Sequence, residues 1–108
     1  MIKSNYEIIK TIVERQSKNK DLSISGKHDG LSLFRYVYYK ICKDYLKKGY
    51  SHTDASKTIK RKHNNSMYAL RCFKNYKDQK FFHSYLELYN DCYFELLELE
   101  SRINLIVA

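Results

Sequence analysis

Residues 60–65 read KRKHNN and place three consecutive basic side chains before a histidine and two asparagines. Lysine and arginine neutralise phosphate groups, and an asparagine amide can pair bidentately with the major-groove edge of adenine. The plainer interpretation is that an asparagine near a helix start is an N-cap and that a short basic run is solvated surface. Each residue type is a weak signal alone, so the prediction of a nucleic-acid surface depends on their convergence in one short segment.

The chain after this segment has the apolar spacing of a helix from about residue 63 to residue 76. Its predicted core face consists of Ala69, Leu70, Phe73 and Tyr76, with Met67 beside it. The opposite face consists of Asn65, Tyr68, Arg71 and Asn75. The polar side chains therefore crowd the amino-terminal half of the helix, on the side away from the core.

A shorter helix is predicted just before the basic run. Ser51 and Asp54 form an S-x-x-D capping pair, and Ala55 and Ile59 are its apolar anchors. A short helix, a tight turn and a longer helix form a helix-turn-helix, whose second helix enters the major groove of DNA with its amino end first. The residues expected to contact DNA from this unit are Lys57, Lys60, Arg61, Lys62, His63, Asn64, Asn65, Tyr68 and Arg71.

Two further helices are predicted before this unit. Residues 4–16 are amphipathic with Ser4 as N-cap, and residues 17–30 read as a long connection. From residue 31 to about residue 48, apolar side chains recur at helical spacing, as in Phe34, Val37, Tyr38, Ile41 and Tyr45. Gly49 is the expected stop, because glycine adopts the left-handed conformation without a Cβ penalty.

The last segment, residues 78–104, is predicted to form a long amphipathic helix with Asp78 as N-cap. One side carries the stripe Phe82, Tyr85, Leu86, Tyr89, Tyr93, Leu96 and Leu97, and the other carries Glu87, Asp91, Glu95 and Glu98. The acidic side should turn away from DNA. The stripe either closes the small core or forms a surface for a homodimer or another protein partner, with Leu105, Ile106 and Val107 available for contact.

Composition limits the class of protein. A chain of 108 residues has room for one domain, 1–108, and no proline with only three glycines favours an all-α fold, a small bundle of about five helices. Residues 1–77 have a net charge of +12 and residues 78–108 of −4, so the basic part should attract a polyanion, nucleic acid first and an anionic membrane second. The alternative is that the lysines only keep the protein soluble.

Other functions find little support in the residues. No apolar run reaches the roughly eighteen residues of a membrane span, the amino terminus is no signal peptide, and a cytoplasmic protein is expected. Cys42, Cys72 and Cys92 are widely spaced without a C-x-x-C pair, which predicts reduced thiols and no metal site. No nucleophile and base stand at a motif spacing and no phosphate-loop motif occurs, so we expect neither an enzyme nor a cofactor.

Residues 51–76, SHTDASKTIKRKHNNSMYALRCFKNY, resemble the C-terminal DNA-binding domain of the bacterial replication initiator DnaA. That family has a helix beginning Ser-Leu, a short turn and a D-H-[ST]-T-[VI]-x-H-A run. Ser51 matches the serine, His63 the first histidine, Asn64 and Asn65 the two hydroxyl residues, Tyr68 the second histidine and Ala69 the alanine. Arg35 and the YVYYKICKDYL after it are similar to the family's R-Q-x-A-x-x-L helix, and the likeness spans about residues 4–77.

The resemblance implies a helix-turn-helix of the DnaA or Trp-repressor kind, in which the helix from His63 touches bases, a basic loop reaches the minor groove and Arg35 contacts phosphate. The chain departs from the family where Lys62 replaces aspartate, Lys-Arg replaces the Gly-Gly of the turn and asparagine replaces both hydroxyl residues. The implied function is therefore DNA binding with the same elements and a different target.

Two hypotheses follow from the sequence. The first is a sequence-selective double-stranded DNA-binding protein of a phage or mobile element in a bacterial host cell, with a regulatory or replication-accessory role. The alternative is a basic helical structural or interaction component, such as a virion or adaptor protein, that keeps the fold without base readout. Binding of duplex DNA at two salt concentrations separates the two.

Overall fold

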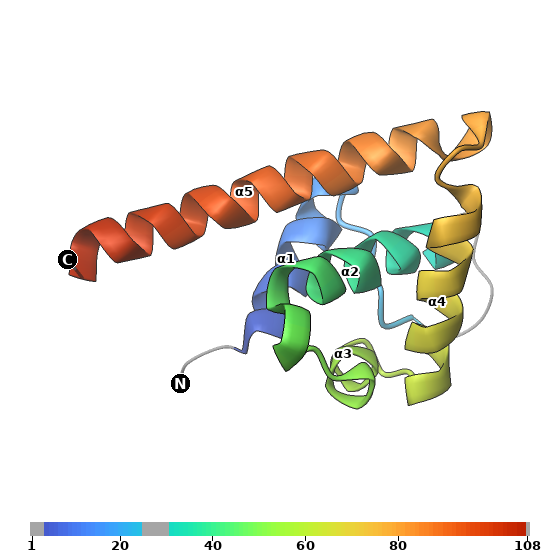
Figure 1. Cartoon of the computed structure of the whole chain (residues 1–108), viewed down its shortest axis with the longest axis horizontal. Coiled ribbons are helices and arrows are strands. Elements are labelled where there is room, and N and C mark those ends of the chain that lie inside the picture. Colours follow the sequence, from blue (N-terminus) through green and yellow to red (C-terminus); the bar gives the residue numbers. More distant parts are fainter. Residues whose placement is uncertain (1–3, 25–30, 108) are drawn as a thin grey trace.

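Helix α2 lies at the centre of the fold, where α1, α4 and α5 pack against it, and α3 packs mainly on α4 and α1 (Figure 1). The computed structural model describes residues 4–24 and 31–107, with side chains as far as residue 102. In these residues the chain forms α1 (Asn5–Gln16), α2 (Leu31–Leu46), η1 (Lys47–Gly49), α3 (His52–Thr58), α4 (His63–Tyr76), η2 (Lys80–Phe82) and α5 (His83–Val107). The prediction of a small all-α bundle is confirmed.

The first helix begins where the sequence predicts. The Ser4 side chain accepts a hydrogen bond from the Glu7 N–H group at 3.2 Å, which satisfies one of the free donors of the first turn. Ile9, Ile12 and Val13 are buried against α2 and α5. The local signal, a capping serine before an apolar stripe, was sufficient to place this helix.

The second helix is buried on more sides than one stripe predicts. Tyr36, Tyr38, Tyr39 and Cys42 are buried together with Val37 and Ile41, because α1, α4 and α5 all pack on α2. The predicted helix end near residue 48 is close to the observed one, because α2 ends at Leu46 and the 3-10 turn η1 ends at Gly49. The expected left-handed glycine is wrong, since Lys47, the first residue of η1, takes that conformation at φ 52°.

The last helix starts later than predicted. Gln79, and not Asp78, caps the short helix η2, and α5 follows from His83. Phe82 and Leu96 are buried, so the interpretation that the stripe closes the core is confirmed for these two residues, and Cys92, which lies outside the predicted stripe, is buried as well. Leu97 is 45% exposed instead.

The carboxyl half of α5 runs past the other helices, and the molecule measures 43 Å along this direction against 28 Å and 27 Å across it (Figure 1). Contacts near the middle of α5 hold the helix in place. The Arg15 guanidinium pairs with Glu95, and Gln16 donates a hydrogen bond to the same carboxylate at 2.8 Å. Leu105, Ile106 and Val107 lie outside the residues whose side chains are described.

The three cysteines are buried and unpaired. Burial raises the pKa of the Cys42 thiol and raises that of Cys92 to about 12. These groups belong to the packing of α2, α4 and α5. Of the described helices, none is long and apolar enough to cross a membrane.

Candidate nucleic-acid interface

Helices α3 and α4 form the predicted helix-turn-helix, and the turn has a defined hydrogen-bond pattern. The Lys60 N–H group donates to the Lys57 carbonyl at 3.0 Å, and the Arg61 N–H group donates to the Ser56 carbonyl at 2.8 Å. These two bonds, with Lys60 at φ 57°, are the Schellman arrangement that ends many helices. Lysine therefore holds the left-handed position at which glycine is usual, and α4 begins three residues later.

Helix α3 starts with the predicted serine cap, and the backbone N–H group of this serine has an unexpected partner. The Ser51 side chain accepts from the Asp54 N–H group at 3.2 Å, whereas the Ser51 N–H group donates to the Tyr6 hydroxyl at 2.8 Å. Tyr6 of α1 thus takes the place that the acid of a capping box normally fills. This contact fixes the entry of the helix-turn-helix against the rest of the fold.

The amino end of α4 is open. Lys62 is its N-cap and makes no side-chain capping bond, and the first turn contains no acidic residue. Neither Asn64 nor Asn65 is the cap, so the plainer interpretation of these two residues is wrong. Uncapped N–H groups and the positive end of the helix dipole are therefore free to meet an anion here.

Seven of the predicted contact residues are exposed at this end of the unit. Tyr68 is 52% exposed and its ring lies 6.3 Å from that of Tyr36, edge to face. Asn64, Tyr68 and Arg71 share one face of α4, because they are spaced by four and three residues. The exposed set is Lys57, Lys60, Lys62, His63, Asn64, Tyr68 and Arg71. Met67, predicted to flank the core, is 49% exposed beside them.

Asn65 lies elsewhere than predicted. It is half-buried, and its Oδ1 atom accepts a hydrogen bond from the Tyr39 hydroxyl at 2.8 Å. The same hydroxyl lies 3.0 Å from the buried Ser56 Oγ. A bidentate contact with adenine needs the amide oxygen, which is already engaged here. Asn65 therefore joins α4 to α2 and α3, and Asn64 is the asparagine that is free to contact a base.

Arg35 also lies inside the fold, so the prediction that it contacts phosphate is wrong. Its side chain is 5% exposed, its Nε atom donates to the Leu22 carbonyl at 2.9 Å, and its Nη2 atom donates to the Ile24 carbonyl. Burial, followed by the nearby Arg61 charge, lowers the pKa of Arg35. The buried guanidinium therefore satisfies two backbone carbonyls of the connection after α1.

Arg61 has a similar role. It is half-exposed, and its guanidinium donates to the same Ile24 carbonyl that Arg35 contacts. One basic residue of the turn is thus partly engaged with the fold, while Lys60 and Lys62 extend into solvent on either side of it.

Tyrosine hydroxyls hold the helix-turn-helix in place, which sequence reasoning missed. Tyr38 donates to the Ala55 carbonyl at 2.8 Å, and the Tyr50 hydroxyl and His52 Nδ1 both contact Ser66 Oγ, the latter at 2.8 Å. Burial raises the pKa of Tyr39 to about 12, although its contact with Ser56 acts in the opposite direction. The available signal was eleven tyrosines in a chain without tryptophan, since a tyrosine buries its ring while its hydroxyl finds a partner.

The candidate interface therefore consists of the open amino end of α4 and the exposed lysines around it, and buried tyrosines fix its position. Comparison with models of known protein families, with curated proteins and with solved structures finds no match, so the likeness to the DnaA domain rests on the residues of this chain alone.

Proposed function

We propose that the protein binds double-stranded DNA by placing the amino-terminal half of α4 in the major groove. The observation that carries the proposal is the uncapped, acid-free start of α4 with Lys57, Lys60, Lys62, His63 and Asn64 exposed around it. Donors, positive charge and the helix dipole all point to a polyanion at this place. A regulatory or replication-accessory role, as the resemblance implies, forms part of the proposal.

Each residue has a distinct part in this function. Lys57, Lys60 and Lys62 neutralise phosphates, and each contact adds about 0.9 to the slope of log affinity against log salt. Asn64 contacts a base edge, because it is the exposed amide of the first turn. Tyr68 and Arg71 follow on the same face, where an aromatic ring contacts a thymine methyl group and a guanidinium contacts guanine or phosphate.

A fluorescence anisotropy titration with duplex DNA tests the proposal. The wild type should bind a random duplex in a salt-dependent manner and should bind a duplex selected from a random pool more tightly. Asn64→Ala should lose about 1–3 kcal/mol on the selected duplex and almost nothing on the random one. The matched control is Asn75→Ala, which changes an exposed asparagine at the far end of the same helix and should leave binding unchanged.

Asn65→Ala serves a different purpose in the same titration. Because Asn65 joins α4 to Tyr39, its removal should lower stability and weaken binding to both duplexes equally. Absence of binding by the wild type near physiological salt would reject DNA as the ligand. An equal loss on both duplexes for Asn64→Ala would reject base readout and leave charge-driven binding only.

The second hypothesis, a structural or interaction component, has one specific observation in its favour. Phe94 of α5 is 63% exposed and lies three residues before Leu97, which is 45% exposed, and neighbouring exposed apolar side chains are typical of a protein contact. This feature lies apart from α3 and α4, so it is compatible with DNA binding and raises a separate question about protein contacts.

A further inference from the structure

A second basic surface lies away from the start of α4. A groove of about 360 Å³ runs between α2 and the carboxyl half of α4, lined by Lys40, Lys43, Leu70, Phe73, Lys74 and Lys77. A neighbouring hollow shares Lys40, Phe73 and Lys77 and continues along Leu86 and Tyr89 of α5. The groove therefore has an apolar floor of leucine and aromatic rings and a rim of four amines.

The rim carries uncompensated positive charge. Lys40 pairs with Asp44 at 3.1 Å and lies 5.9 Å from the centre of the Phe73 ring. Lys43 lies over the Tyr50 ring at 5.5 Å, and neither it nor Lys74 nor Lys77 makes an ion pair with the described residues. An apolar floor with three unpaired amines suits a segment that is both apolar and acidic.

This groove is separate from the proposed DNA interface. Lys74 follows His63 by eleven residues, which is about 16 Å along the α4 axis. In Figure 1 the carboxyl end of α4 lies near the start of α5, and its amino end lies near α3. The two basic surfaces thus occupy opposite ends of one helix, so occupation of one leaves the other open.

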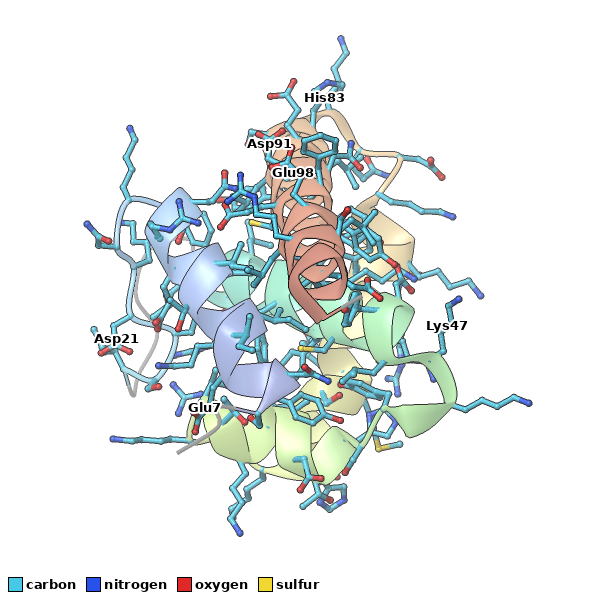
Figure 2. All side chains as sticks on the ribbon, turned by 90° about the vertical axis from the view of Figure 1, so that its left-hand side faces the viewer. Glu7, Asp21, Lys47, His83, Asp91 and Glu98 are labelled. Atoms are coloured by element: carbon cyan, nitrogen blue, oxygen red, sulfur yellow. The ribbon has the colours of Figure 1, made fainter. Side chains whose placement is uncertain are left out.

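The outer side of α5 has the complementary character. Phe94 is 63% exposed and Leu97 is 45% exposed, and both lie near the middle of α5, next to Glu95 and Leu96, which contact the bundle with the other side of the helix. Asp91 and Glu98 flank Phe94 at three residues before and four after, and both are exposed on the outer side of α5 (Figure 2). Glu95 turns inward to Arg15 and takes no part.

We propose that the outer side of α5 of one copy docks in the lysine-rimmed groove of a second copy. Phe94 and Leu97 would cover the apolar floor, and Asp91 and Glu98 would meet the amines of the rim. The same molecule cannot make this contact, because α5 is one continuous helix that projects away from its own groove. The inference does not rest on DNA binding, since it concerns surfaces that the proposed interface does not use.

Charge decides between this arrangement and a symmetric dimer. Two α5 helices packed face to face would bring Asp91 and Glu98 of both copies together, and two facing grooves would oppose lysines to lysines. Like charges across an interface are costly, whereas groove against helix pairs opposite charges. The contact is therefore heterologous, and repetition of it builds an open chain instead of a closed pair.

Sedimentation velocity over a series of protein concentrations, without DNA, tests this inference. The wild type should associate beyond a dimer at about 0.05 M salt and should dissociate at about 0.5 M, because the contact is largely electrostatic at its rim. The groove variant is Lys74→Glu with Lys77→Glu, and the helix variant is Phe94→Ser with Leu97→Ser. Each should weaken self-association about tenfold or more. All four positions are exposed, so circular dichroism should show an unchanged fold.

Mixing the two variants gives the sharpest result. The groove variant keeps its helix and the helix variant keeps its groove, so an equimolar mixture should form one-to-one dimers and stop there. Lys20→Glu with Lys48→Glu makes the same charge change at exposed lysines outside the groove and should associate like the wild type. Asp91→Lys with Glu98→Lys is a second helix variant that retains Phe94 and tests charge alone.

Several outcomes would overturn the inference. A wild type that stays monomeric at every concentration rejects self-association. A helix variant that dissociates while the groove variant associates normally indicates a symmetric α5 dimer instead. A mixture that fails to dimerise rejects the pairing of these two surfaces. The failure of DNA binding would affect none of these results, because no nucleic acid is present in the measurement.

Discussion

The Tyr39 hydroxyl of α2 contacts Ser56 of α3 and Asn65 of α4. Removal of this single oxygen tests whether these contacts stabilise the packing of the helix-turn-helix on α2. Tyr39 and Ser56 are fully buried, and Asn65 is half-buried. A phenol carries one proton, so Tyr39 donates to the Asn65 oxygen and accepts from the Ser56 hydroxyl. The change Tyr39→Phe keeps the ring in the core and leaves both partners without this bond.

The size of the effect follows from the exposure of the two partners. A buried polar group left without a partner costs about 1–3 kcal/mol. Ser56 can turn its hydroxyl to a carbonyl of its own helix, and half-buried Asn65 regains water, so both costs fall near the lower end. We expect Tyr39→Phe to lower the free energy of unfolding by about 1–2 kcal/mol. In a domain of this size each kcal/mol lowers Tm by roughly 4–8 °C.

Urea unfolding followed by circular dichroism measures this change. Tyr85→Phe is the control, because Tyr85 is half-buried and its hydroxyl makes no hydrogen bond with the described residues. In a double-mutant cycle, Tyr39→Phe should cost at least about 0.5 kcal/mol less when Asn65→Ala is already present. A change in stability within about 0.5 kcal/mol of zero, or full additivity with Asn65→Ala, would refute the reasoning.

Three further predictions concern the same region. Lys60→Gly should stabilise the protein by about 1 kcal/mol in urea unfolding, since glycine relieves the left-handed strain at φ 57°. The control Lys57→Gly should destabilise the protein, because Lys57 lies inside α3. Arg35→Ala should cost about 1–3 kcal/mol by leaving the Leu22 carbonyl unpaired and by removing one of the two guanidinium contacts of the Ile24 carbonyl. The salt slope of DNA binding should not change, and a slope smaller by about one would identify Arg35 as a phosphate contact. Because Tyr39 ionises at 10.0 when exposed but its pKa is about 12 in the fold, its contribution to stability is complete below pH 10 and disappears as the pH rises from 10 to 12. Urea midpoints over this range should fall less steeply for Tyr39→Phe than for the wild type, and parallel curves would contradict this.

The helices and the caps of α1 and α3 could be predicted from the sequence because their causes are local. Ser4 and Ser51 bond to N–H groups three residues ahead, and the apolar spacing of each helix repeats within the helix itself. The left-handed conformation expected at Gly49 and the cap expected at Asp78 were wrong in a related way. Lys47 takes the left-handed conformation and Gln79 caps η2, so in both places a neighbouring residue has the predicted role.

Only the tertiary structure decided which basic and amide side chains are exposed and which form hydrogen bonds inside the fold. Asn64 and Asn65 are adjacent and chemically identical, yet one extends into solvent and the other meets Tyr39, twenty-six residues away. Arg35 has a side chain that could contact phosphate, but it donates instead to the Leu22 and Ile24 carbonyls, which belong to a different segment of the chain. The sequence by itself determined that this chain is a basic helical bundle, because charge and periodicity are properties of short segments, whereas the open start of α4 became visible only in the structure. Which cations remain available, and that four lysines of α2 and α4 meet in one groove, depend on contacts between distant segments that no local pattern encodes.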